Sequence, residues 1–167
     1  QHMLWKLNQS GQAGIVLANG SMSSNTSGEG NIRKKMVKDD VIEIMVALPE
    51  KLFLNTGIPV CLWFLTNDKS KNGRNRRNET LFIDARSLGT MKTRVLKVLT
   101  DKDIQKITQT VFAWKKNDNY QDVKGFCKSC TIKDIENNNF ILTPSRYVGF
   151  ADEDDDSVPF EEKIKFL

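Results

Sequence analysis

The chain has 167 residues, a formal net charge of +4 and 39% hydrophobic residues, enough apolar material for one domain with a packed core. Its longest apolar runs reach about half of the roughly 20 residues that a membrane-spanning helix needs, and the first residues lack the basic-then-apolar pattern of a signal peptide. We therefore expect a soluble globular protein with no membrane segment. Because the chain begins with Gln, we also expect it to be a piece of a longer polypeptide.

Charge is distributed unevenly along the chain. Residues 1–150 contain 23 Lys and Arg against 14 Asp and Glu, a net charge of +9, because seven acidic residues lie between 152 and 162. A body this basic favours a polyanion such as DNA or RNA as its partner. We expect residues 151–167 to form an acidic linker and the start of a carboxy-terminal tail.

The first elements alternate between helix and strand. Residues 2–7 have helical spacing, and the short apolar run 13–18, bounded by turn residues, predicts a central strand covered on both faces. A loop rich in Ser, Asn and Gly leads to a helix over 31–38, for which Asn31 is the expected N-cap.

Three further strands follow. Residues 41–48, 58–65 and 80–84 are apolar runs of strand length. The nine residues 49–57 are too few for a helical crossover, so the second and third strands should pair antiparallel. The sequence thus predicts an α/β fold: part of a doubly wound, Rossmann-like sheet of parallel strands with an antiparallel hairpin at its edge.

The last third of the sequence predicts two helices and an extended segment. Thr100 precedes a helix whose apolar residues recur at helical spacing and should face the core. These residues are Ile104, Ile107, Val111 and Trp114. Residues 131–136 predict a short helix, and residues 140–148 should be extended.

The chain offers little that resembles a metal or catalytic site. Cys127 and Cys130 form one C-x-x-C pair, Cys61 lies in an apolar run, and His2 is the only histidine, so a zinc site lacks ligands. Sparse, unpaired thiols favour a reducing cytoplasm, with Cys127 and Cys130 lying near a turn. Gly28-Glu-Gly30 begins like a dinucleotide fingerprint, but Arg33 stands where the third glycine belongs. We expect no catalytic, metal-binding or cofactor-binding residue in this chain.

One family nevertheless shares long stretches of this sequence. The stretches are Ala13 to Ser21, Asn31 to Lys35, Val41 to Leu65, Thr80 to Arg86 and Phe140 to Val148. They resemble the modification subunit of type I restriction-modification systems, and 41–65 is the most specific part. The resemblance implies an adenine-specific DNA methyltransferase that uses S-adenosylmethionine. It also implies DNA, a specificity subunit, a second modification subunit and a restriction subunit as partners.

The resemblance also shows what this chain lacks. In that family a cofactor-binding glycine motif and an Asn-Pro-Pro-aromatic tetrapeptide precede the matching region, and neither occurs here. Residues 1–150 therefore resemble the carboxy-terminal half of the catalytic domain. We expect the chain by itself neither to bind the cofactor nor to transfer methyl groups.

Two groups of residues are candidates for contact with DNA in the whole enzyme. Phe53 matches the aromatic residue at the start of a related motif in adenine methyltransferases, so it is the candidate for stacking on the extruded base, although it could equally be an apolar plug beneath the hairpin. Asn19, Gly20 and Ser21 follow the first strand, at the edge where ligands sit in open α/β sheets, so they could line the active-site cleft or could form an ordinary strand-ending turn. The second group is a basic loop that could bind phosphates or could be a solvated hairpin tip. Its members are Lys69, Lys71, Arg74, Arg76 and Arg77.

Two functions remain open at this level. The first is part of a DNA adenine methyltransferase. The alternative is a non-catalytic basic module that binds nucleic acid or assembles a complex.

Overall fold

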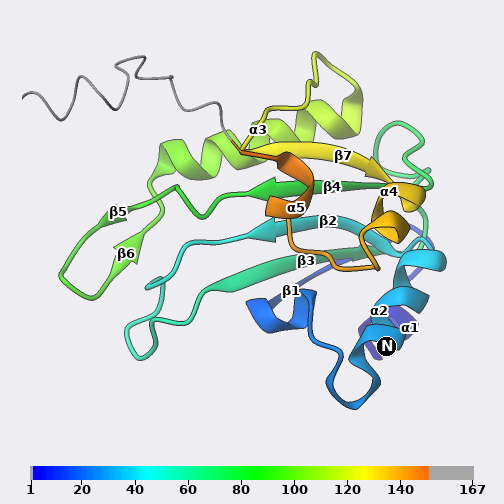
Figure 1. Cartoon of the computed structure of the whole chain (residues 1–167). Coiled ribbons are helices and arrows are strands. Elements are labelled where there is room, and N and C mark those ends of the chain that lie inside the picture. The colour runs from blue at the N-terminus through cyan, green and yellow to red at the C-terminus, as the bar shows by residue number, and fades with distance from the viewer. Residues whose placement is uncertain (1, 151–167) are drawn as a thin grey trace, which may run out of the picture.

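The computed structural model describes residues 2–150, which fold around one mixed sheet (Figure 1). The sheet order is β1-β3-β2-β4-β7, and a separate two-stranded hairpin pairs β5 with β6. The strands are β1 (Gln12–Ala18), β2 (Ile42–Ala47), β3 (Val60–Thr66), β4 (Glu79–Asp84), β5 (Thr90–Met91), β6 (Lys97–Val98) and β7 (Cys127–Thr131). The α-helices are α1 (His2–Lys6), α2 (Glu29–Lys38), α3 (Asp101–Lys116), α4 (Ile132–Asn137) and α5 (Ser145–Val148). Two 3₁₀ turns, η1 (Asn19–Met22) and η2 (Thr26–Gly28), connect β1 to α2. The predicted acidic linker, 151–167, lies outside the described residues.

The strand directions confirm an α/β fold and correct its details. β2 runs parallel to β4 and antiparallel to β3, as predicted for the second and third strands. The antiparallel hairpin, however, lies inside the sheet, because β3 is inserted between β1 and β2. A helix between the strands 13–18 and 41–48 predicts a β-α-β unit in which the two strands lie side by side in the same direction. The directions agree with this prediction, but β3 separates the two strands, so the expected pairing is wrong.

β1 is an edge strand of the described sheet and not a central one. Its residues alternate between exposed and half-buried, whereas all six residues of β2 are buried. A short apolar run does not by itself distinguish a strand covered on both faces from one covered on a single face. The sequence predicted a central strand here because the exposed positions of the run 13–18 are also occupied by residues that are not polar, namely Gly14, Val16 and Ala18.

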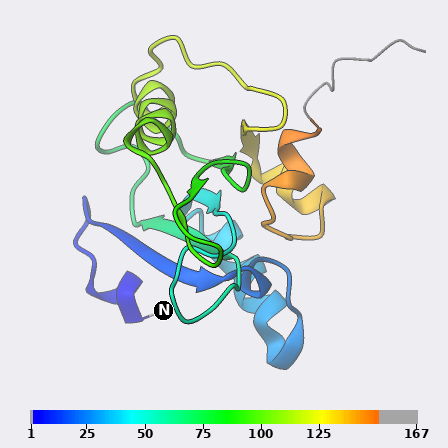
Figure 2. The ribbon, with the colours of Figure 1, turned by 90° about the vertical axis from the view of Figure 1, so that its left-hand side faces the viewer.

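Alternate residues of the central strands build two cores on opposite faces of the sheet. Met45 and Phe82 face the core that contains α4 and α5, whereas Ile44 and Leu81 face the core beneath α3. Figure 2 shows α3 on one side of the sheet and α2, α4 and α5 on the other. The central strands thus form a layer between helices, because successive side chains along a strand point to opposite faces of the sheet.

Capping chemistry explains where the later helices begin. Thr100 and Thr131 each accept a hydrogen bond from the N–H three residues on, and Asp103 and Asp134 return one, which completes two capping boxes. The predicted helices after these threonines are confirmed. α2 is different: it begins at Glu29 after Gly28 in a left-handed conformation (φ +82°), so Asn31 is not its N-cap.

Three smaller expectations about the later segments are corrected. Ile104 is 48% exposed, whereas Trp114 is fully buried, because only one stripe of α3 faces the sheet. The segment 140–148 ends in the short helix α5. Cys127 and Cys130 lie in strand β7, where pairing with β4 buries both.

Candidate functional site

The strand directions sort the connecting loops onto two opposite edges of the sheet. β1, β2 and β4 point the same way, so the segments 19–22, 48–59 and 85–100 leave at one edge, which we term the carboxyl edge. The loop 67–78, which follows the reversed strand β3, leaves at the other edge, which we term the amino edge. In Figure 1 these edges lie at the left and right of the sheet. The predicted base-binding residues and the predicted phosphate-binding loop are therefore on opposite sides.

The residues after β1 form the tight turn η1, which is tied to the segment carrying Phe53. The Asn19 N–H donates to the carbonyl of Pro59 at 3.3 Å. Ser21 Oγ accepts a 3.2 Å bond from the indole of Trp63 and lies 3.4 Å from Cys61 Sγ. Gly20 is open, since a Cβ there would meet nothing within 4 Å. Hydrogen bonds thus hold the turn in place, and there is open space next to Gly20.

Asn19 carries an unsatisfied acceptor. Its Oδ1 is buried, and among residues 2–150 no donor reaches it. A buried polar atom without a partner is uncommon and costs about 1–3 kcal/mol. This unpartnered amide oxygen lies beneath the surface of the turn at the carboxyl edge.

Phe53 lies in the connection between β2 and β3, in a turn closed by a bridge to Thr56. Its side chain is 45% exposed, and Leu54 beside it is 76% exposed. A side chain buried beneath the hairpin would show far less surface. Phe53 is therefore partly accessible to solvent at the carboxyl edge, which is compatible with stacking on a base.

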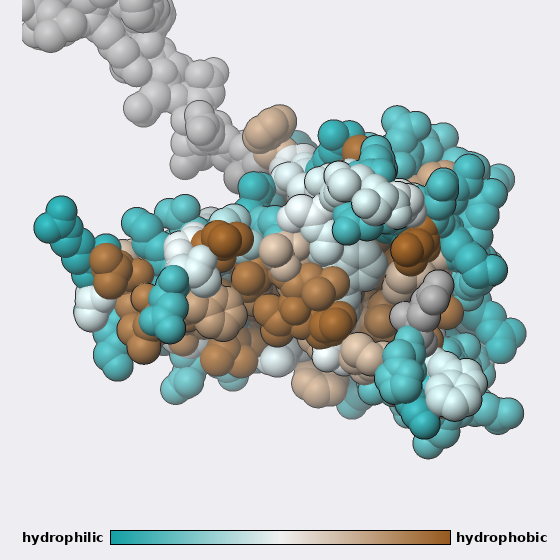
Figure 3. Space-filling view, turned by 90° about the horizontal axis from the view of Figure 1, so that it is seen from below, coloured by the Kyte–Doolittle hydropathy of each residue, from teal (hydrophilic) through white to brown (hydrophobic). Residues whose placement is uncertain are grey.

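An apolar cavity of about 260 Å³ lies between α1, α2 and the outer strands of the sheet. Ile15, Leu17 and Trp63 line it, and Ser21 and Arg33 supply polar atoms. Figure 3, seen from the side on which β1 lies, shows apolar surface gathered over the middle of this face. Ser21 therefore joins the carboxyl-edge turn to an apolar surface.

The position that departs from the dinucleotide fingerprint has a structural role. Buried Arg33 donates to the carbonyl of Phe140 at 2.9 Å and to that of Ser24 at 2.6 Å. Burial lowers the pKa of its guanidinium. A Cβ at Gly30 would come within 2.3 Å of Asn25 Oδ1, so this loop is filled by its own side chains. The segment has no open cradle for a nucleotide phosphate.

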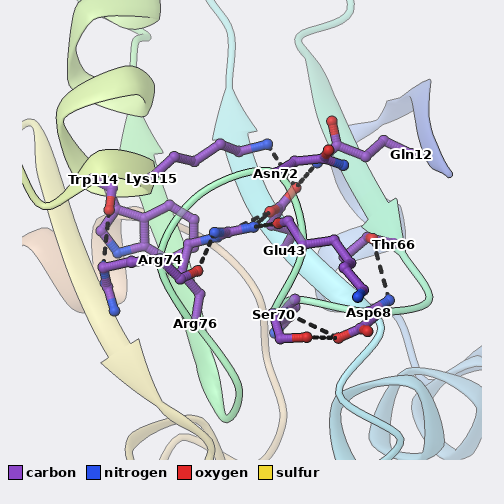
Figure 4. A network of polar contacts seen from close by, with 12 residues as sticks. Gln12, Glu43, Thr66, Asp68, Ser70, Asn72, Arg74, Arg76, Trp114 and Lys115 are labelled. Atoms are coloured by element: carbon purple, nitrogen blue, oxygen red, sulfur yellow. Dashed lines mark hydrogen bonds and ion pairs between the residues drawn. The ribbon is translucent and has the colours of Figure 1, made fainter. Parts of the chain in front are cut away.

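Two of the five basic residues of the loop 67–78 are buried in ion pairs. Lys69 is 2% exposed, and its Nζ lies 2.5 Å from Asp40 Oδ1. Arg76 is fully buried, with Nη2 at 2.8 Å from Glu43 Oε1 (Figure 4). Burial lowers the pKa of Lys69, while Asp40 acts in the opposite direction. These charges are neutralised within the fold, so neither side chain reaches a phosphate.

The other three basic residues of the loop differ in how strongly they are paired with carboxylates and in how exposed they are. Arg74 forms two bonds to the Glu79 carboxylate, at 3.0 and 2.6 Å, and this pairing lowers the pKa of Glu79. Arg77 is exposed and contacts Asp68 at 3.3 Å, and Lys71 is exposed. Lys71 and Arg77 are therefore the exposed basic residues of this loop.

A second basic segment escaped sequence reasoning. Residues 86–100 contain four Lys and Arg and no Asp or Glu, and they contribute the hairpin β5–β6 at the carboxyl edge. Its strands have two residues each, too short for a periodic signal. The one feature of the sequence that could have identified this basic segment is its lack of acidic residues.

The three cysteines are buried, free thiols. Burial raises the pKa of Cys61 and of Cys127, and it raises the pKa of Cys130 to about 12. Cys127 and Cys130 belong to different cores, on opposite faces of β7. Within residues 2–150 no group of three potential metal ligands is found, and no helix has the length and apolarity to span a bilayer.

Three comparisons relate the chain to known proteins. It is 52% identical over its whole length to the type I restriction enzyme HindI methylase subunit of Haemophilus influenzae, of which it covers 37%. It is 37% identical over 98% of its length to the MjaIX methylase subunit of Methanocaldococcus jannaschii, of which it covers 29%. The chain thus spans about a third of the length of these curated relatives.

Solved structures agree. The methyltransferase subunit of a type I restriction-modification system from Streptococcus thermophilus superposes with a TM-score of 0.73 at 28% identity, over 87% of this chain and 28% of that one. The family model for N-6 DNA methylases matches residues 1–156. On this match, the chain belongs to the N-6 DNA methylase family.

Proposed function

We propose that the chain is part of the modification subunit of a type I restriction-modification system, an enzyme that transfers a methyl group from S-adenosylmethionine to adenine N6 in DNA. The family match carries this proposal. The carboxyl edge supports it, because the segments that carry the exposed Phe53 and the unpartnered Asn19 Oδ1 both leave the sheet there. In the cell we place the enzyme in the cytoplasm, with DNA and with the specificity, second modification and restriction subunits as partners.

Within that enzyme, the chain supplies the wall of the target-base pocket. Phe53 stacks on the extruded adenine, since an enzyme that modifies a base must hold it outside the duplex against an aromatic or apolar surface. Asn19, Gly20 and Ser21 form the neighbouring rim, which is open at Gly20. The loop 67–78, with its exposed Lys71 and Arg77, leaves the sheet at the opposite, amino edge and is not part of this wall.

The described residues do not fit the methyl-donor cofactor. Their one glycine-rich loop is filled by Asn25 and followed by buried Arg33. We therefore assign the cofactor site to sequence outside this chain. Accordingly, residues 1–167 alone should give no calorimetric signal with S-adenosylmethionine, and stoichiometric micromolar binding would contradict the assignment.

The base-pocket proposal is tested by neighbouring substitutions in the polypeptide that the gene encodes. Phe53→Ala should lower kcat/KM for methyl transfer by roughly 5- to 150-fold, since stacking on an aromatic ring contributes about 1–3 kcal/mol per base. Leu54→Ala, which removes an even more exposed apolar side chain from the same turn, is the control and should leave methyl transfer unchanged.

The non-catalytic alternative predicts a different result. A basic module that only binds nucleic acid would show no methyl transfer with any variant, while DNA binding persists. Equal kcat/KM values for Phe53→Ala and Leu54→Ala would instead be consistent with a methyltransferase but would show that Phe53 does not stack on the target base.

A further inference from the structure

The hairpin β5–β6 presents a dense, unneutralised positive charge. Lys92 and Arg94 are exposed and Lys97 is half-buried. No ion pair joins any of the three to a carboxylate in the described part of the chain. Arg86, at the base of the hairpin, is instead held by Asp84, with Nη2 at 2.7 Å from Oδ2. Three cations therefore remain available at one short element.

Local contacts give the hairpin a defined shape. Its tip is a turn in which the Lys92 N–H donates to the Leu96 carbonyl at 2.8 Å, and Thr93 Oγ1 accepts from the Leu96 N–H at 3.1 Å. At its base, Gly89 has a left-handed φ of +86°, and a Cβ there would lie 3.0 Å from the Val98 carbonyl oxygen and 3.1 Å from the Lys97 stem. Glycine at this position allows the strands to close.

The hairpin is also joined to the proposed base pocket. The Lys97 N–H donates to the Lys51 carbonyl at 2.7 Å, so the hairpin is fixed to the segment that carries Phe53. Both leave the sheet at the carboxyl edge, and Figure 1 shows the hairpin projecting outward from that end. A duplex whose base reaches Phe53 would bring its backbone near these cations.

We propose that the β5–β6 hairpin binds the phosphate backbone of duplex DNA through Lys92, Arg94 and Lys97, and so positions the duplex beside the base pocket. The inference rests on the proposed function. It assigns backbone contact to a segment at the carboxyl edge and not to the loop 67–78. Contacts of this kind orient a duplex without reading its sequence.

The test compares two variants with equal loss of charge in the full-length polypeptide. The first is Lys92→Gln with Arg94→Gln, and the control is Lys71→Gln with Arg77→Gln, which removes one exposed lysine and one exposed arginine from the amino edge. Equilibrium affinity for a duplex, followed by fluorescence anisotropy, is measured from 50 to 300 mM salt. The hairpin variant should bind more weakly and lose about 1.8 from the magnitude of the log–log salt slope, about 0.9 for each phosphate contact.

The control variant should keep the parent slope, and a charge-conserving variant, Lys92→Arg with Arg94→Lys, should restore it. Thermal unfolding of each variant checks that the fold is retained. Equal slope losses in the hairpin and control variants would overturn the inference. A hairpin variant that keeps the parent salt slope but no longer binds a partner subunit would also overturn it. If the unsubstituted polypeptide methylates DNA but only the hairpin prediction fails, the proposed function survives. If it neither binds nor methylates DNA, both fail.

Discussion

Two basic segments of this protein look alike in sequence and differ in space. The loop 67–78 has five Lys and Arg, and the segment 86–100 has four. In the loop, Lys69 and Arg76 are buried against carboxylates and Arg74 is paired twice with Glu79. In the hairpin, Lys92, Arg94 and Lys97 have no carboxylate partner among residues 2–150.

The difference shows that the density of basic residues does not identify a nucleic-acid contact. Whether a basic residue is free to contact DNA depends on whether the fold brings an acidic residue from a distant part of the sequence next to it. Glu43, which pairs with Arg76, lies 33 residues earlier and also accepts bonds from Gln12 and Lys115, at 2.8 and 3.0 Å (Figure 4). The loop is thus a structural junction between β1, β2 and α3, and the hairpin is a surface.

The largest predicted effect contrasts two adjacent arginines of the loop. Arg76→Ala leaves the Glu43 carboxylate buried with one of its cations removed, and it should lower the free energy of unfolding by about 3–5 kcal/mol. Arg77→Ala, at an exposed pair, should change it by less than about 0.5 kcal/mol. Urea unfolding of both variants measures the difference. Similar values would mean that the loop, like the hairpin, is a surface.

The next effect concerns the backbone of the hairpin. Gly89→Ala places a side chain at φ +86° against the Val98 carbonyl, and a strained conformation of this kind costs about 1–3 kcal/mol. Without any change of charge, amides of 90–98 should then exchange hydrogen faster and DNA should bind more weakly. Gly57→Ala, where a Cβ meets nothing closer than 3.9 Å, is the control. Unchanged DNA affinity in Gly89→Ala would show that DNA binding does not depend on the conformation of the hairpin.

A smaller effect follows from the pH dependence of the loop. The hydrogen bonds from Arg74 hold the pKa of Glu79 below its ordinary value. The folded state therefore binds fewer protons than the unfolded state between these two values, so this stabilisation is present above the ordinary carboxyl pKa and is lost as pH falls through the lowered one. In Arg74→Gln the deficit in stability relative to the parent should be present at pH 7 and should shrink toward pH 3. A deficit that is constant with pH would show that Arg74 acts by packing alone.

The smallest effect is expected at the hairpin surface. Lys92→Gln with Arg94→Gln should change the free energy of unfolding by less than about 0.5 kcal/mol, because no described contact of these side chains is lost. Denaturant unfolding checks this value. A loss above about 1 kcal/mol would show that the two cations stabilise the fold, and would remove the contrast with the loop.

Local patterns predicted much of the secondary structure. The apolar runs became β2, β3 and β4, and Thr100 and Thr131 began helices as their capping boxes require. The position of Phe53 at an exposed turn agreed with its sequence context. The expected places of Asn19, Gly20 and Ser21, directly after a strand, were also found.

The sequence by itself determined the types of the longer elements and the family, because hydrophobic periodicity, caps and shared motifs depend on neighbours along the chain; it did not reveal the short strands β5, β6 and β7 or the helix α5. Only the tertiary structure decided that β3 separates β1 from β2, and that the loop 67–78 and the Phe53 turn lie at opposite edges. It also decided which cations are neutralised. Strand order and ion pairing join residues far apart in the chain, such as Glu43 and Arg76. Their partners are chosen by packing of the whole domain, which no local pattern records.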